Sequence, residues 1–72
     1  MRSFYHFLMT YRGSKQVDDA SRLAEWAFAD HYFPKQSKDY DELSNYLEWN
    51  SPFPTALMVF DDLWDTYTMH ED

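Results

Sequence analysis

The chain has 72 residues, a formal net charge of −7 and no cysteine. Without cysteine it forms no disulfide and no thiolate metal site, and a core this small rarely supplies more than about 3–5 kcal/mol of stability. No run approaches the roughly 20 apolar residues that span a bilayer, and no cleavable leader is visible at the start. These features favour one small domain over residues 1–72, soluble and cytoplasmic, with no membrane partner.

The first helix is predicted over about residues 3–12. Ser3 is a typical N-cap residue, because its hydroxyl accepts a hydrogen bond from a free backbone N–H. Gly13 can adopt the left-handed conformation that ends many helices. Between these two signals, apolar side chains recur at helical spacing: Phe4, Phe7, Leu8 and Tyr11.

The second helix is predicted over about residues 19–32. Asp18 or Asp19 can serve as its N-cap, and Pro34 sets its end because the residue before a proline is pushed away from α geometry. The core-facing stripe follows the i, i+3, i+4, i+7, i+8 pattern of an amphipathic helix: Ala20, Leu23, Ala24, Ala27 and Phe28.

Two further helices are predicted over about residues 38–49 and 55–68. Asp39 with Glu42 three residues later forms a capping-box pattern, and Thr55 is a candidate N-cap of the last helix. The expected core face of the third helix consists of Tyr40, Leu43 and Leu47. That of the fourth consists of Leu57, Phe60, Trp64 and Tyr67, with Leu63 beside them.

The connections between these helices are short, about five to seven residues, and this favours neighbouring helices packed as hairpins. No segment alternates apolar and polar residues for long enough to predict a strand. Aromatic residues make up 21% of the chain, so a few large rings can fill a small core. The sequence therefore predicts an all-α fold of four short helices.

Motifs of catalysis and cofactor binding are absent from the sequence. A single glycine excludes a phosphate-binding P-loop and a dinucleotide-binding fingerprint. The three histidines are far apart and form no metal-binding pair. The acidic segment "DDLWD", with Asp61, Asp62 and Asp65, is similar to a Mg²⁺-diphosphate motif, but 72 residues cannot enclose the cavity which that chemistry needs. We expect no enzymatic activity, no catalytic residue, no metal and no cofactor.

Charge is distributed unevenly along the chain. Residues 1–38 contain all six Lys and Arg residues with four acids, a net charge of +2, whereas residues 39–72 contain nine acids and no Lys or Arg, a net charge of −9. The N-terminal half could meet an anionic partner and the C-terminal half a basic one. The candidate partner-binding cations are Arg12, Lys15, Arg22, Lys35 and Lys38. Trp26 and Trp49 are candidates either for exposed interface anchors or for cover at the rim of the core.

Four segments, taken together, resemble the YozE family of small bacterial proteins: "SFYHFLMTYR", "FPKQS", "DYDELSNYLE" and "FDDLWDTY". They occur in the family's order, and the resemblance covers nearly the whole chain. It implies a fold like the sterile alpha motif (SAM), in which two helical hairpins pack across one another. The family's function is uncharacterised, so the resemblance implies no catalytic or binding residue.

The leading functional hypothesis is a small non-enzymatic adaptor that binds another protein through polar contacts around an exposed aromatic residue. The alternative is a weak nucleic-acid-binding protein that uses the basic N-terminal half. The negative net charge of the chain disfavours this alternative. Carboxylates on the third helix would also face the phosphates of the nucleic acid, whose contacts supply most non-specific affinity. A third hypothesis is a domain that acts only as a homo-oligomer.

Overall fold

The computed structural model describes residues 2–13 and 18–70. In chain order the elements are α1 (Phe4–Leu8), the 3₁₀ helix η1 (Met9–Tyr11), α2 (Asp19–Ala29), α3 (Tyr40–Trp49) and α4 (Ala56–His70). No strand occurs in the two described ranges. The predicted all-α fold of four helices is therefore confirmed.

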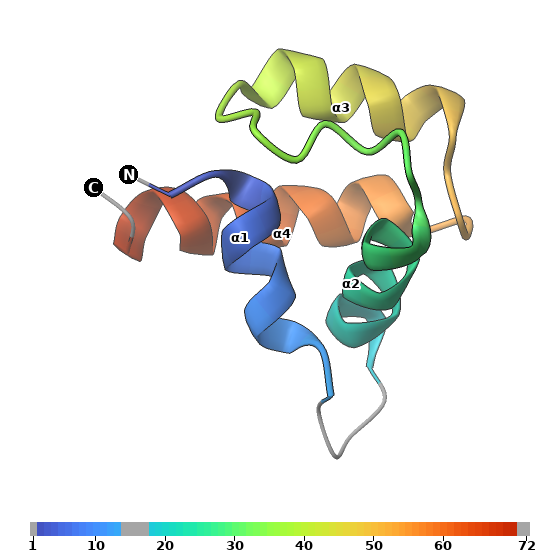
Figure 1. The fold of residues 1–72 in the computed structure, drawn as a ribbon, viewed down its shortest axis with the longest axis horizontal. Helices are drawn as coiled ribbons and strands as arrows, with labels where there is room; N and C mark the ends of the chain where they lie inside the picture. Colours follow the sequence, from blue (N-terminus) through green and yellow to red (C-terminus); the bar gives the residue numbers. More distant parts are fainter. Residues whose placement is uncertain (1, 14–17, 71–72) are drawn as a thin grey trace.

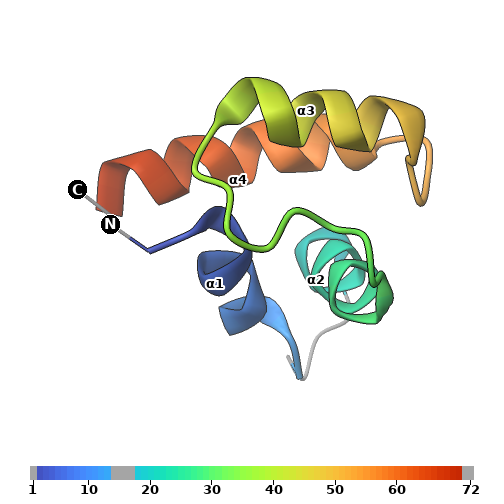
Figure 2. The ribbon, with the colours of Figure 1, turned by 45° about the horizontal axis from the view of Figure 1, so that its top comes forward.

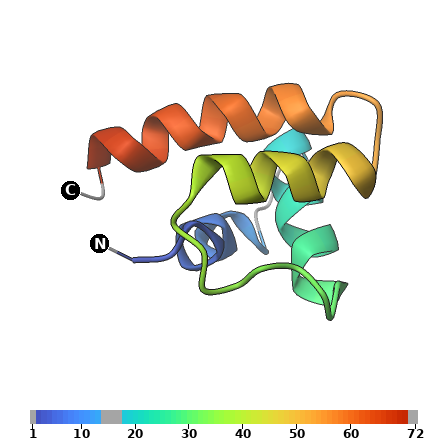
Figure 3. The same ribbon diagram turned by 90° about the horizontal axis from the view of Figure 1, so that it is seen from above.

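The helices form two hairpins that pack across one another. α3 lies antiparallel to α4, and α1 with η1 pairs with α2 (Figures 1 and 3). The longest helix, α4, contacts α1, α2 and α3. Figure 2 shows the connection between α2 and α3 passing close to the start of α1 before it reaches α3. α4 is therefore the helix against which the other three α-helices pack.

A cluster of aromatic rings joins the start of the chain to α4. Phe4 is fully buried, and its ring centroid lies 5.0 Å from Phe60, 5.5 Å from Tyr67 and 5.8 Å from Trp64. The Tyr67 hydroxyl donates a hydrogen bond to the backbone carbonyl of Arg2, so the start of the chain and the end of α4 lie side by side (Figure 1). These rings pack in tilted and edge-to-face pairs, and each buries a large apolar area, so a few of them fill much of this small core.

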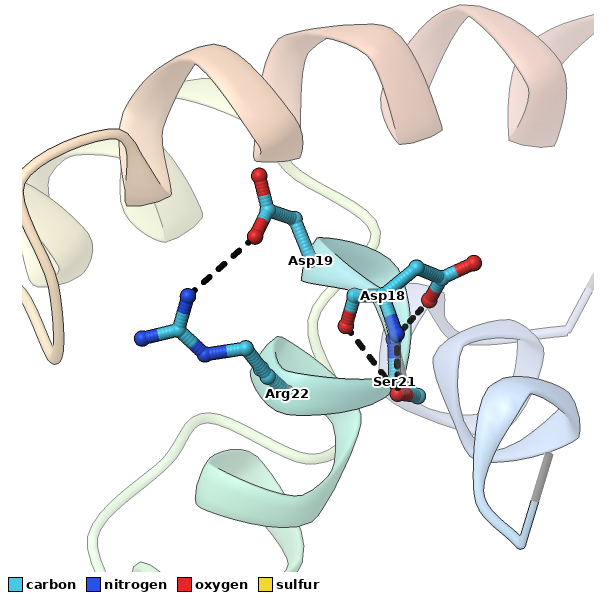
Figure 4. A network of polar contacts seen from close by, with 4 residues as sticks. All are labelled: Asp18, Asp19, Ser21 and Arg22. Carbon is cyan, nitrogen blue, oxygen red and sulfur yellow. Dashed lines mark hydrogen bonds and ion pairs between the residues drawn. The ribbon is translucent and has the colours of Figure 1, made fainter. Parts of the chain in front are cut away.

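A capping box begins α2. The Asp18 carboxylate accepts a hydrogen bond from the Ser21 N–H at 2.9 Å, and the Ser21 hydroxyl accepts one from the Asp18 N–H at 3.1 Å. Asp18 is therefore the N-cap, and Asp19 instead pairs with Arg22 at 3.2 Å on the first turn (Figure 4). The reciprocal bonds satisfy backbone donors that would otherwise lack partners at the helix start.

α2 ends at Ala29, three residues before the predicted end at residue 32. Asp30 adopts an extended conformation (φ −89°, ψ 112°), and its carboxylate accepts a hydrogen bond from the Tyr32 N–H at 3.0 Å. An aspartate that bonds the backbone two residues later competes with the helical hydrogen-bond ladder. The prediction used Pro34 as the stop signal and missed this earlier one.

The connection between α2 and α3, here called the 30–39 joint, is anchored by one buried ring. Phe33 is only 4% exposed although it lies outside any helix. Its ring centroid lies 5.7 Å from Tyr5, 6.0 Å from Trp26 and 5.8 Å from Tyr46. The ring therefore ties the joint to α1, α2 and α3 at once.

The predicted capping box does not form at the start of α3, although Asp39 is its N-cap. The Asp39 carboxylate accepts a hydrogen bond from the Asp41 N–H at 3.1 Å, as a helix cap does. The Asp39 N–H donates to the Ser37 hydroxyl at 3.1 Å, which replaces the expected bond to Glu42. The Glu42 carboxylate is therefore left on the surface of α3.

Three residues predicted in the core are exposed: Phe28, Tyr40 and Leu57. Phe28 is 51% exposed, because α2 ends one residue later and leaves the last position of its stripe at the edge, where the Arg12 guanidinium covers it. Tyr40 is the first residue of α3, and its ring lies on the outside of Phe60, stacked against it. The buried face of α4 starts at Ala56, one residue before Leu57, and a shift of one residue turns a side chain by about 100°.

Candidate functional site

A groove lined by aromatic and polar side chains lies between the 30–39 joint and α3. We call it the aromatic groove, and its volume is about 390 Å³. Its lining residues come from both sides: Tyr32, Pro34, Glu42, Asn45, Tyr46, Trp49 and Asn50.

Two aromatic side chains on the walls of the groove are almost fully exposed. Tyr32, from the 30–39 joint, is 85% exposed, and Trp49, from the last turn of α3, is 84% exposed. Rings of this size are usually covered in a small protein, since each can remove about 150–250 Å² from water. Their exposure on one groove makes it a candidate contact surface.

A half-buried hydrogen bond joins Tyr46, one of the lining residues, to Asp30. The Tyr46 hydroxyl donates to the Asp30 carboxylate, which links α3 to the residue that ends α2. Burial, together with this hydrogen bond, raises the pKa of Tyr46 to about 12. The hydroxyl therefore stays protonated, and keeps its role as a donor, to a higher pH than an ordinary tyrosine would.

The α3 wall presents four side chains at helical spacing. Glu42, Asn45, Tyr46 and Trp49 stand at i, i+3, i+4 and i+7, which places them on one face of the helix. The Asn50 side-chain amide donates to the Tyr46 carbonyl at 2.9 Å and closes the C-terminal end of α3 beside Trp49. A carboxylate, an amide and an exposed indole thus follow one another along a single wall.

The two predicted tryptophans differ in their surroundings. Trp26 is half-buried, and its ring centroid lies 6.0 Å from Phe33 and 6.3 Å from Tyr46. It covers the rim of the core, which was one of its two predicted roles. Trp49 is the exposed one of the pair.

Arg12 and Arg22, two of the predicted cations, lie against rings on the α2 side of the fold. The Arg12 guanidinium stacks 3.4 Å from the Phe28 ring centroid, and its Nε pairs with Glu25 at 3.2 Å. Arg22 lies 4.5 Å from the Phe53 ring centroid and pairs with a carboxylate on its own helix. Both guanidinium groups are therefore already engaged within the chain.

The lysines lie elsewhere. The Lys35 ammonium is 5.5 Å from the ring centroid of Tyr5 at the start of α1, and Lys38 is exposed in the 30–39 joint. Lys15 lies outside the described residues. Arg12 and Arg22 thus contact side chains of α2, whereas Lys35 lies near the start of α1.

A larger hollow, of about 550 Å³, lies between α2 and the connection from α3 to α4. Its charged side chains are Arg22 and Glu25, and each is already in an ion pair with another residue of the chain. The aromatic groove is smaller, but it carries the two most exposed rings. We therefore take the aromatic groove as the candidate site.

The acidic segment of α4 takes part in a surface contact. The Tyr40 hydroxyl donates to the Asp61 carboxylate at 2.6 Å, and the Tyr40 ring stacks on Phe60. This hydrogen bond, with the negative charge nearby, raises the pKa of Tyr40. Across residues 2–13 and 18–70, no three His, Asp or Glu side chains are grouped as a metal site would require.

None of the helices in the described part of the chain has the length and apolar character needed to cross a membrane.

Of the residues that line the groove, sequence reasoning named only Trp49 as a candidate, either for an exposed anchor or for cover at the rim of the core. Tyr32 and Pro34 belong to a connection, and their place opposite α3 depends on how Phe33 folds the joint. The spacing of Glu42, Asn45 and Trp49 was visible in the sequence. It carried little information there, because a polar helix face is usually only solvated.

Comparisons with known proteins agree with this fold. Residues 3–69 match the YozE SAM-like fold family. The chain is 49% identical to a UPF0346 protein of Listeria monocytogenes serotype 4a, over 99% of this chain and 92% of the relative. It is 48% identical to YozE of Bacillus subtilis, over 93% and 90%. The solution NMR structure of Bacillus subtilis YozE superposes with a TM-score of 0.84 at 45% identity, over 99% of this chain and 87% of that one. The chain therefore belongs to the YozE SAM-like fold family.

Proposed function

We propose that the protein is a small non-catalytic domain that binds another protein through the aromatic groove. The observation that carries this proposal is the near-complete exposure of Tyr32 and Trp49 on the two walls of one groove. Tryptophan and tyrosine are among the residues most enriched at the positions that dominate binding energy in protein interfaces.

The walls of the groove support this role because they are fixed before a partner arrives. The Tyr46–Asp30 hydrogen bond and the buried Phe33 ring hold the 30–39 joint against α3. A preformed surface loses less conformational freedom on binding than a mobile one. The polar rim, with Glu42 and Asn45, also matches the usual anatomy of an interface, an apolar centre with polar surroundings.

The alternative, a weak nucleic-acid-binding protein, has less support. Arg12 and Arg22 are already paired with carboxylates, and the Lys35 ammonium lies 5.5 Å from the Tyr5 ring centroid. Phosphate contacts supply most non-specific affinity for nucleic acid, so cations that are already engaged favour only weak binding. We expect no shifted band in an electrophoretic assay with duplex DNA at low salt, and a salt-sensitive complex would favour the alternative instead.

Affinity capture with matched variants tests the protein-binding proposal. The wild type, Trp49→Ala and Met69→Ala are immobilised and exposed to an extract of Bacillus subtilis, the source of one relative. Met69 is a matched control, because it is 73% exposed but lies near the end of α4. Both substitutions should change stability by less than about 0.5 kcal/mol, as surface substitutions usually do, which circular dichroism will check.

The expected result is a protein retained by the wild type and by Met69→Ala but lost from Trp49→Ala. Equal recovery on all three baits, or no retained protein at all, would contradict the proposal.

A further inference from the structure

We infer that the aromatic groove binds an arginine side chain of the partner, with the guanidinium stacked on Trp49. This inference rests on the proposed function and names the chemistry of the partner. Three observations support it: how the chain holds its own arginines, which groups line the α3 wall, and how charge is distributed.

The chain holds two of its own guanidinium groups on aromatic rings. Arg12 stacks 3.4 Å from the centre of the Phe28 ring while its Nε pairs with Glu25 at 3.2 Å. Arg22 lies 4.5 Å from the centre of the Phe53 ring and also pairs with a carboxylate. A ring for the guanidinium plane and an acceptor for its N–H groups therefore form a recurring arrangement in this molecule.

The α3 wall offers a similar set of groups without a cation. Trp49 is 84% exposed, and none of the cation–ring contacts among the described residues involves it. Asn45 lies one turn earlier on the same face, where its carbonyl oxygen can accept a guanidinium N–H. Glu42 lies about two turns from Trp49, roughly 10 Å along the helix, near enough to attract a cation through solvent.

The surrounding charge favours a cationic partner. α3 carries three acids and no Lys or Arg, a net charge of −3, whereas the 30–39 joint on the other wall balances two acids with two lysines. An acidic surface raises the local concentration of basic segments and speeds their association. Arginine fits better than lysine, because its planar guanidinium stacks on an indole and its N–H groups point outward in a fixed fork.

A random peptide library displayed on phage is the probe. It is selected on the wild type after depletion on Trp49→Ala, so that only peptides that need Trp49 are recovered. Recovered peptides are then synthesised with arginine, lysine or citrulline at each arginine position. Their affinities are measured by isothermal titration calorimetry for the wild type, Trp49→Ala, Trp49→Phe, Glu42→Gln and the control Met69→Ala.

We expect arginine to be enriched in the recovered peptides, and citrulline at the key position to weaken binding by about two- to thirtyfold, the range of cation–π contacts. Peptides with lysine at the key position should bind more weakly than those with arginine. Among the protein variants, Trp49→Phe should retain part of the affinity and Glu42→Gln should weaken binding about twofold. Met69→Ala should have no effect.

Two failures are distinguishable. Peptides that require Trp49 but bind equally well with citrulline would overturn the arginine inference and leave the protein-binding function intact. If no peptide requires Trp49 and affinity capture also yields no Trp49-dependent protein, both the inference and the proposed function are wrong.

Discussion

Replacing Phe33 should destabilise the protein more than its position in a connection suggests. The side chain is only 4% exposed and contacts the rings of Tyr5, Trp26 and Tyr46. Truncation of a buried phenylalanine to alanine costs about 3–5 kcal/mol. A core of this size supplies about the same amount in total, so Phe33→Ala should be largely unfolded at about 25 °C.

A smaller change makes the effect measurable. Phe33→Leu keeps an apolar side chain but loses the three ring contacts, and we expect a cost of about 1–2 kcal/mol. For a domain of this length, that corresponds to a fall in Tm of about 5–15 °C. Tyr32→Ala is the matched control, since Tyr32 is the adjacent residue and is 85% exposed. It should change stability by less than about 0.5 kcal/mol.

Urea denaturation followed by circular dichroism and by tryptophan fluorescence measures these differences. The two signals should give the same midpoint if unfolding is two-state. A Phe33→Leu protein as stable as Tyr32→Ala, or a folded Phe33→Ala protein within about 1 kcal/mol of the wild type, would refute the view that this ring holds the joint.

Three further predictions concern single contacts. Tyr46 should ionise near pH 12 when folded and near pH 10 when unfolded. Its contribution to the free energy of unfolding is therefore intact below pH 10 and is lost as the pH rises toward 12. Tyr46→Phe should flatten that loss in denaturation curves measured across this range. Asp18→Ala should cost about 1 kcal/mol by removing the cap of α2, whereas Asp18→Asn should cost less; thermal unfolding compares them. Gly13 has a φ of 73°, and a Cβ placed there would meet no atom within 4 Å. Gly13→Ala should therefore lower the free energy of unfolding by about 1–2 kcal/mol from backbone strain alone. An unchanged Tm would contradict this.

The helices were predictable because local signals determine them. The N-caps Ser3, Asp18 and Asp39 all accept the expected backbone hydrogen bonds, and such bonds depend only on residues within one turn. The end of α2 was missed because Asp30 also forms a local bond that competes with the helix. In the sequence, Asp30 looks like many other aspartates that form no such turn.

The groove was not predictable, because it depends on contacts between segments far apart in the chain. Phe33 was interpreted only as the residue before a proline, yet it is buried by rings from three helices. Phe28 shows the opposite error, since its helical spacing predicted burial and the packing of α2 left it at the edge. Periodicity identifies the side of a helix that faces the core, but not how far along the helix the core extends.

The 30–39 joint links stability to the proposed binding surface. Phe33 is buried in the core while the adjacent Tyr32 is exposed on the groove, so the buried ring fixes the place of the exposed one. Asp30 ends α2 and also accepts the hydrogen bond from Tyr46, a lining residue of the groove. The groove should therefore keep its shape only while Phe33 is in place, and Phe33→Leu should weaken binding by more than the fraction of molecules that it unfolds.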